Sequence, residues 1–189
     1  MTYFYQQIQS HITVIQSLAA MQDAVDQTID LLVQAIFRGS KLLICGNGGS
    51  AADAQHFAAE IVGRFKKERR PWPAIALTTD TSILTAVGND YGFDEIFARQ
   101  VAGTGRPGDI LMGISTSGNS PNVLKALQTA RDMDMITSCL LGKNGGDLAF
   151  AVDYPLVVQS QDTARIQEAH IFLIHYMADC LETQLMELS

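Results

Sequence analysis

The sequence lacks the features that mark secreted, membrane-spanning and nucleic-acid-binding proteins. It has three cysteines in 189 residues, and an odd number without metal-type spacing predicts reduced, buried thiols in a cytoplasmic protein. The first residues lack the basic start and apolar block of a signal peptide. No stretch approaches the ~20 apolar residues that a membrane helix needs. A net charge of −7 repels nucleic-acid phosphates, so we expect neither a membrane nor a nucleic acid as a partner.

Charged residues are also scarce, at 17% of the chain, whereas hydrophobic residues make up 47%. This balance excludes a disordered chain and provides a sizeable core, and the length fits one domain over residues 1–189. A local run of basic residues precedes Pro71, and we interpret it as a solvated loop. Its members are Arg64, Lys66, Lys67, Arg69 and Arg70.

The N-terminal part of the chain has the periodicity of helices. Apolar residues recur at helical spacing near 4–20 and 23–38, so residues 1–38 are predicted to form a helical extension, and Gly39 to end it as a C-cap. The apolar stripe of the second helix consists of Val25, Ile29, Leu32, Val33 and Ile36. Two interpretations stay open: these apolar faces pack on a second subunit, or they cover the domain's own sheet.

From residue 39 onward, strand-like runs alternate with helix-like stretches. Alternation of this kind predicts an α/β fold, a three-layer α/β/α sandwich with a five-stranded parallel sheet in residues 39–189. The final helix is predicted over 162–187. The expected strands are 41–45, 73–78, 109–114, 135–141 and 154–158.

Two of these strands end in loops of glycine and small polar residues before a helix. Backbone N–H groups and hydroxyls at a helix N-terminus form an anion site, so two such loops predict a phosphorylated ligand held at one end. The first loop, residues 46–50, also matches the G-x-G-x-x-G/A dinucleotide fingerprint. The acidic residue that should follow comes late, at Asp80, so a nicotinamide-dependent dehydrogenase is the weaker alternative.

The second loop is the more specific anion site. Four hydroxyls surround Gly118 and precede Pro121, a residue suited to the first turn of a helix. They belong to Ser115, Thr116, Ser117 and Ser120. Hydroxyls at a helix N-terminus bind a phosphate monoester without Lys or Arg, although Ser120 could instead cap the helix.

Acid–base and metal-binding groups follow the first loop and recur in the final helix. His56 and Glu60 are four residues apart and share a helical face, a spacing that lets them chelate one divalent ion or simply form a surface pair. In the final helix, Gln167 and His175 flank the buried stripe about 12 Å apart along the axis, so reaching one metal together needs long reaches or an irregular turn. His170 points elsewhere and is interpreted as structural.

Five segments together make the chain similar to the sugar isomerase (SIS) domain family, and most of all to its isomerases of heptose phosphates. The resemblance spans nearly the whole chain. The matching segments are 45–50, 56–60, 87–93, 113–120 and 165–170, the last followed by His175.

This resemblance implies a cytoplasmic homotetramer with its active sites where subunits meet. It implies one zinc ion per subunit, with ligands at His56, Glu60, Gln167 and His175. It also implies a set of substrate contacts at Asn47, Gly48, Gly49, Glu60, Asn89, Asp90, Ser115, Thr116, Ser117, Ser120 and Gln167.

The implied reaction converts sedoheptulose 7-phosphate to D-glycero-D-manno-heptose 7-phosphate, an early step toward activated heptoses for lipopolysaccharide or other surface glycans. Ketose–aldose isomerisation needs a base and an acid, and we assign these catalytic roles to Glu60 and His175, with Asp90 and Gln167 orienting hydroxyls. The alternative is a non-catalytic SIS-domain regulator, such as a replication-initiator-associating protein. Such a relative would need the hydroxyl-rich loop but not the acid–base set.

Overall fold

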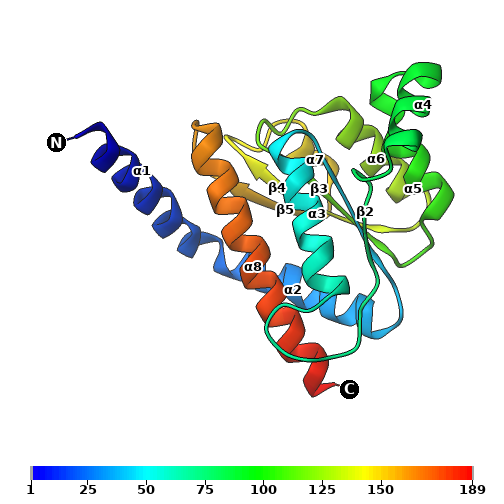
Figure 1. Cartoon of the computed structure of the whole chain (residues 1–189), viewed down its shortest axis with the longest axis horizontal. Coiled ribbons are helices and arrows are strands. Elements are labelled where there is room, and N and C mark those ends of the chain that lie inside the picture. Colours follow the sequence, from blue (N-terminus) through cyan, green and yellow to red (C-terminus); the bar gives the residue numbers. More distant parts are fainter. Residues whose placement is uncertain (1, 189) are drawn as a thin grey trace.

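The computed structural model describes residues 2–188, beginning with a helical extension. Helix α1 (Tyr3–Ser17) passes through a short 3₁₀ turn, η1 (Leu18–Met21), into α2 (Gln22–Phe37). Helix α1 projects from the body of the molecule beside the last helix (Figure 1). The predicted stripe of α2 is buried, and Ser40 donates to the carbonyl of Ala35 at 3.0 Å around Gly39, whose φ is +90°. The predicted helices are therefore confirmed, while the C-cap residue is Arg38 and Gly39 follows it in the left-handed conformation.

The centre of the molecule is a five-stranded parallel sheet in the order β2-β1-β3-β4-β5. Its strands are β1 (Leu42–Gly46), β2 (Ala74–Ala76), β3 (Ile110–Ser115), β4 (Ile136–Gly142) and β5 (Tyr154–Val158). These are the five expected strands with small shifts of their ends. Because β1, β3 and β4 are buried on both faces, they appear in the sequence as continuous apolar runs.

Helices cover both faces of the sheet, which confirms the three-layer prediction (Figure 1). One apolar core joins α2, α3 and the last helix to alternate strand residues such as Ile44 and Met112, and the other joins α5 and α6 to Leu43 and Leu111. The remaining helices are α3 (Gly49–Val62), α4 (Thr81–Tyr91), η2 (Phe93–Glu95), α5 (Ala98–Thr104), α6 (Pro121–Asp132), α7 (Leu148–Ala151) and α8 (Thr163–Glu187).

Two expectations from the sequence need correction. The basic run is not simply a solvated loop, because the side chain of Arg69 is only 3% exposed and pairs with the buried Glu182. The three cysteines are free, as expected, but Cys180 is half-buried, whereas Cys45 and Cys139 are buried. Within the described residues, none of the helices has the length and apolar character that crossing a membrane requires.

Candidate active site

The two anion-binding loops meet at one edge of the sheet. Strands β1 and β3 are neighbours, and the helices that follow them, α3 and α6, pack on opposite faces. A parallel sheet forms its ligand crevice at such a point. The side-chain amides of Asn47, in the first loop, and Asn122, in the first turn of α6, exchange two hydrogen bonds of 2.9 Å. The crevice therefore has a polar link across its floor.

In the first loop, a glycine allows the last helix to approach the start of α3. A Cβ on Gly49 would overlap Nε2 of Gln167, from α8. Gly48 has a φ of +57°, a conformation that other residues rarely adopt. The structure thus brings three of the predicted substrate contacts, Gly48, Gly49 and Gln167, to one place.

The hydroxyls of the second loop converge on one another. The Oγ of Ser115 lies 2.9 Å from that of Ser120 and 3.4 Å from that of Ser117, and it accepts a 3.1 Å bond from the N–H of Gly118. Ser120 is the N-cap residue of α6, as the sequence suggested, but its side chain makes no cap hydrogen bond. Its hydroxyl instead faces that of Ser115.

A turn between β4 and α7 holds the second loop in place. The N–H of Leu148 donates to the carbonyl of Gly118 at 3.0 Å, and the N–H of Asp147 donates to Oδ1 of Asn119 at 3.0 Å. A Cβ on Gly118 would overlap the carbonyl of Gly145. The sequence analysis did not predict this contact between the two loops, because the only local sign of it is the pair of glycines at 145–146.

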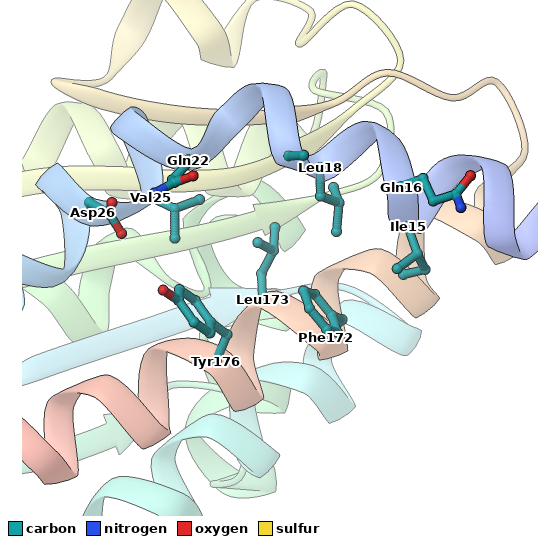
Figure 2. Close-up of a pocket in the computed structure, with 10 residues that line it drawn as sticks. Ile15, Gln16, Leu18, Gln22, Val25, Asp26, Phe172, Leu173 and Tyr176 are labelled. Carbon is teal, nitrogen blue, oxygen red and sulfur yellow. The ribbon is translucent and has the colours of Figure 1, made fainter.

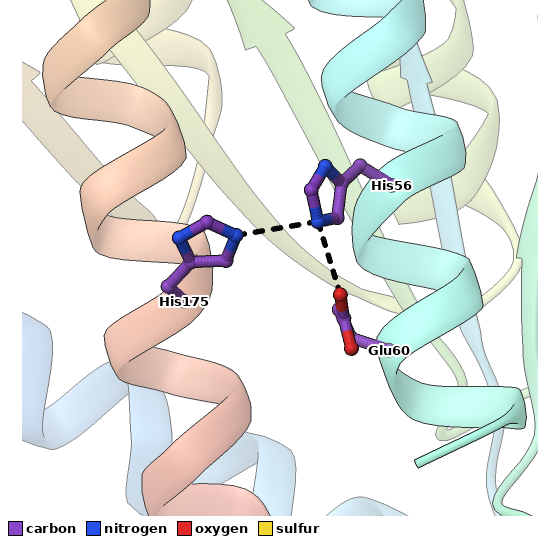
Figure 3. A group of neighbouring side chains, drawn as sticks. All are labelled: His56, Glu60 and His175. Carbon is purple, nitrogen blue, oxygen red and sulfur yellow. Dashed lines mark hydrogen bonds and ion pairs between the residues drawn. The ribbon is translucent and has the colours of Figure 1, made fainter. Parts of the chain in front are cut away.

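Helices α3 and α8 lie side by side and bring together His56, Glu60 and His175 (Figure 3). The Nε2 atom of His56 lies 3.0 Å from Oε1 of Glu60 and 3.2 Å from Nε2 of His175. One ligand atom from each residue lies within 4.8 Å of the others. The i, i+4 spacing predicted the first pair, and the structure adds the imidazole from the other helix.

This donor set suits a divalent metal ion. Two nitrogens bound at 2.0–2.1 Å in a tetrahedral zinc site would stand about 3.3 Å apart, close to the 3.2 Å between the imidazoles of His56 and His175. One imidazole nitrogen carries at most one proton, so Nε2 of His56 cannot donate to Glu60 and also accept from His175. A cation among the three atoms would satisfy all of them at once.

Two further groups at the cluster were missed by the sequence analysis. Asp53 lies one turn before His56 on α3, and its Oδ2 is buried without a hydrogen-bond partner among the described residues. Burial raises the pKa of Asp53 to about 6, partly offset by the nearby His56. The i, i+3, i+7 spacing of Asp53, His56 and Glu60 was the available signal. The ring of Phe65 stacks on His175 with 5.7 Å between centroids, and no pattern indicated that contact.

Other predicted site residues lie apart from this cluster. Asn89 and Asp90 are exposed at the end of α4, where they hydrogen-bond to each other at 2.7 Å. Within the part of the chain that the structure describes, no hydrogen bond joins them to His56, Glu60 or His175. Helix α4 has no buried residue among those described, and it stands across the molecule from α8 (Figure 1).

The remaining histidines have structural surroundings. The Nε2 of His170 lies 3.1 Å from the carbonyl of Leu141, and burial lowers the pKa of this histidine to about 4. His11, for which the sequence offered no partner, lies 2.7 Å from Glu168. Glu168 in turn pairs with Arg165, whose guanidinium donates to a carbonyl of α1. These bonds fasten α1 to α8.

Comparison with known proteins places this arrangement in a class. The sequence model described as the SIS domain matches residues 3–142, which contain the whole sheet up to β4 and both anion-binding loops. The fold and the hydroxyl-rich crevice are thus those of a SIS domain.

Relatives then narrow the class. A phosphoheptose isomerase of Citrifermentans bemidjiense is 56% identical over 180 residues, covering 95% of this chain and 94% of that protein. One from Neisseria gonorrhoeae is 50% identical and covers 99% of both. A solved structure of phosphoheptose isomerase from Neisseria gonorrhoeae superposes with a TM-score of 0.91 at 47% identity, covering 95% of this chain and 97% of that chain. The chain belongs to the SIS domain family and, within it, to the phosphoheptose isomerases, which are sugar-phosphate isomerases.

Proposed function

We propose that this enzyme interconverts sedoheptulose 7-phosphate and D-glycero-D-manno-heptose 7-phosphate. The observation that carries the proposal is the convergence of His56 and Glu60 from α3 with His175 from α8. This cluster lies about 10 Å along α3 from the first anion-binding loop, seven residues at 1.5 Å each. A ligand whose phosphate sits among the loops and whose carbonyl reaches the cluster must be long, which favours a heptose over a triose.

Binding begins at the phosphate. The hydroxyls of Ser115, Thr116, Ser117 and Ser120 would donate to the phosphate oxygens, and the N–H groups of Gly48 and Gly49 would add donors from the opposite loop. Asn47, already bonded to Asn122, would orient a sugar hydroxyl. The helix dipoles of α3 and α6 favour an anion at this position.

The reaction moves one proton between C1 and C2 of the sugar and another between their oxygens. Glu60 is the base that takes the carbon-bound proton, and His175 is the acid that serves the oxygens, a division that the two residue types allow near neutral pH. Gln167 and Asp90 orient the hydroxyls of the substrate. Removing the carbon-bound proton places negative charge on the former carbonyl oxygen of the enediolate, so donors aimed at that oxygen accelerate the step.

One zinc ion per subunit would be held by His56, Glu60, Gln167 and His175. When bound, the metal would polarise the carbonyl and organise the ligands around it. A carboxylate that binds metal is a weaker base, so Glu60 would act at different moments as ligand and as base. Gln167 lies further along α8, against Gly49, and would reach the metal only through a long side-chain extension.

We further propose a cytoplasmic homotetramer of single-domain subunits, with residues 1–38 at the interfaces. Between α1–α2 and α8 lies a groove of about 540 Å³ (Figure 2). Its floor is apolar, and Phe172 and Tyr176 are 47% and 43% exposed there. Tyr3 and Phe4 on α1 are exposed as well. Because α4 stands across the molecule from α8 (Figure 1), Asn89 and Asp90 would serve the active site of a neighbouring subunit in this assembly.

The test is turnover of sedoheptulose 7-phosphate with added zinc, followed by mass-resolved separation of the sugar phosphates. We expect Glu60→Gln and His175→Gln to abolish turnover and to leave ester binding, measured calorimetrically, largely intact. Glu68→Gln is the matched control, because this carboxylate is 90% exposed and lies just beyond α3. A near-normal rate in either site variant would remove the assigned role. A wild-type chain that binds the ester without converting it would support the regulator instead.

A further inference from the structure

The segment after α3 folds around one buried carboxylate. Glu182, on α8, has no exposed surface, yet four donors surround it. Its oxygens accept N–H bonds from Phe65 and Lys66 at 2.9 Å each and from Lys67, and Nε of Arg69 lies 3.3 Å away. Burial alone would raise the pKa of Glu182, but these bonds together bring it below the usual value. The carboxylate is thus a charged anchor for residues 65–69.

Arg69 connects that anchor to the end of α3. Its Nη2 donates to the carbonyl of Glu60 at 2.7 Å, and its Nη1 donates to the carbonyls of Ile61 and Gly63 at 2.9 and 3.1 Å. The last carbonyls of a helix lack partners within the helix, so this guanidinium serves as the C-terminal cap of α3. It also lies over the ring of Trp72, 3.9 Å from the centroid.

Both ends of this pair stand next to the reactive cluster. Arg69 bonds the backbone of Glu60 itself, and Glu182 follows His175 by seven residues, two turns along the same face of α8. Between them, Phe65 donates its N–H to Glu182 and stacks its ring on His175 at an interplanar angle of 29°. One network of charged hydrogen bonds therefore contacts both α3 and α8, the two helices that supply the cluster.

We propose that Arg69 and Glu182 form a positioning pair, with Phe65 as its arm, that sets the separation of Glu60 and His175 for metal binding. The inference rests on the metal site of the proposed function and adds residues that hold no substrate or metal. In the cluster, the ligand nitrogens of His56 on α3 and His175 on α8 lie 3.2 Å apart. Apolar packing between helices tolerates shifts that a fixed network of charged hydrogen bonds does not.

A merely structural role would give a different result. If the pair only stabilises the end of α3, its loss lowers the melting temperature but leaves the metal affinity of the folded protein unchanged. If it positions the ligands, metal affinity falls even in protein that is fully folded. Substitutions around metal ligands typically cost about 10- to 100-fold in affinity when they act by orientation.

The experiment titrates metal-free protein with Co²⁺ and follows its visible absorption, with zinc affinity measured by competition against a chromophoric chelator. Arg69→Lys keeps the charge but loses the planar fork of donors. Phe65→Leu removes the stacking on His175 without exposing a buried charge, so it carries the test if Arg69→Lys fails to fold. Arg70→Lys and Phe150→Leu are the matched controls, because both side chains are exposed.

We expect about 10- to 100-fold weaker metal binding and an altered Co²⁺ spectrum in Arg69→Lys and Phe65→Leu, with both controls at wild-type values. Fluorescence of Trp72, the only tryptophan, reports whether residues 65–69 keep their position in each variant, because Arg69 lies over its ring. Wild-type affinity and spectrum in both folded variants would overturn the inference, as would a wild-type chain that binds no metal. A wild-type chain that binds metal but converts no ester would overturn the proposed function and leave the positioning pair standing.

Discussion

Lowering the pH from 7 to 5 is expected to make the contribution of one buried histidine to stability less favourable. His170 has no exposed surface, its Nε2 faces the carbonyl of Leu141, and its Nδ1 has no partner among the described residues. Burial lowers its pKa from 6.5 to about 4. The neutral ring therefore fits the core, and the protonated ring does not.

The sign and size follow from proton linkage. Between pH 6.5 and about 4 the unfolded chain binds a proton at His170 that the native chain does not, so stability falls as the pH falls through this window. At pH 5 the unfolded histidine is almost fully charged, and the native one is about a tenth charged. With 1.36 kcal/mol for each unit of pKa, the loss from pH 7 to 5 is about 2 kcal/mol.

The assay is urea unfolding at pH 7 and pH 5, followed by circular dichroism at one fixed protein concentration, because subunit association would couple stability to concentration. His170→Gln keeps an N–H for the carbonyl of Leu141 but has no group that titrates here. Its loss of stability between the two pH values should be smaller than that of the wild type by about 2 kcal/mol. Equal losses in the two proteins would refute the reasoning, whatever the baseline stability of the variant.

Two glycine substitutions should act in different ways. There is no room for a side chain in Gly118→Ala, because the Cβ would overlap the carbonyl of Gly145 and the φ of residue 118 is +70°. The melting temperature and the calorimetric affinity for a sugar phosphate should therefore both fall. Wild-type values of both would contradict the role given to the turn between β4 and α7 in supporting the second loop. In Gly49→Ala, the nearest atoms to the new Cβ belong to the end of the flexible Gln167 side chain, so that side chain should turn away. The free energy of unfolding should change by less than about 1 kcal/mol, and the KM should rise severalfold. An unchanged KM would remove Gln167 from the substrate site.

Most of the fold could be predicted from local patterns in the sequence. Strands buried on both faces appear as apolar runs, and the amphipathic stripe of α2 appears at helical spacing, so the element order could be predicted with boundary errors of a few residues. The edge where both loops meet also followed, because the carboxyl ends of adjacent parallel strands lie together.

The candidate site could be predicted only in part from local patterns. The spacing of His56 and Glu60 is local and visible, but His175 joins them from 119 residues away, and only the family resemblance indicated it. The same distance problem hid Glu182, which lies 113 residues from Arg69. In a sequence, a run of basic residues looks solvated, since the one carboxylate that buries part of it belongs to another helix. Tertiary pairing of charges has no local signature.

The hydroxyl-rich turn hangs from strand β3, whereas the reactive imidazoles and carboxylate project from α3 and α8. In the proposed function, the turn supplies most of the phosphate contacts, whereas the chemistry falls to side chains further along the two helices. A duplicated gene could lose the catalytic side chains by two or three substitutions on the helices and still encode a protein that binds a phosphorylated sugar. Such an inactive copy would already have the binding half of a metabolite sensor.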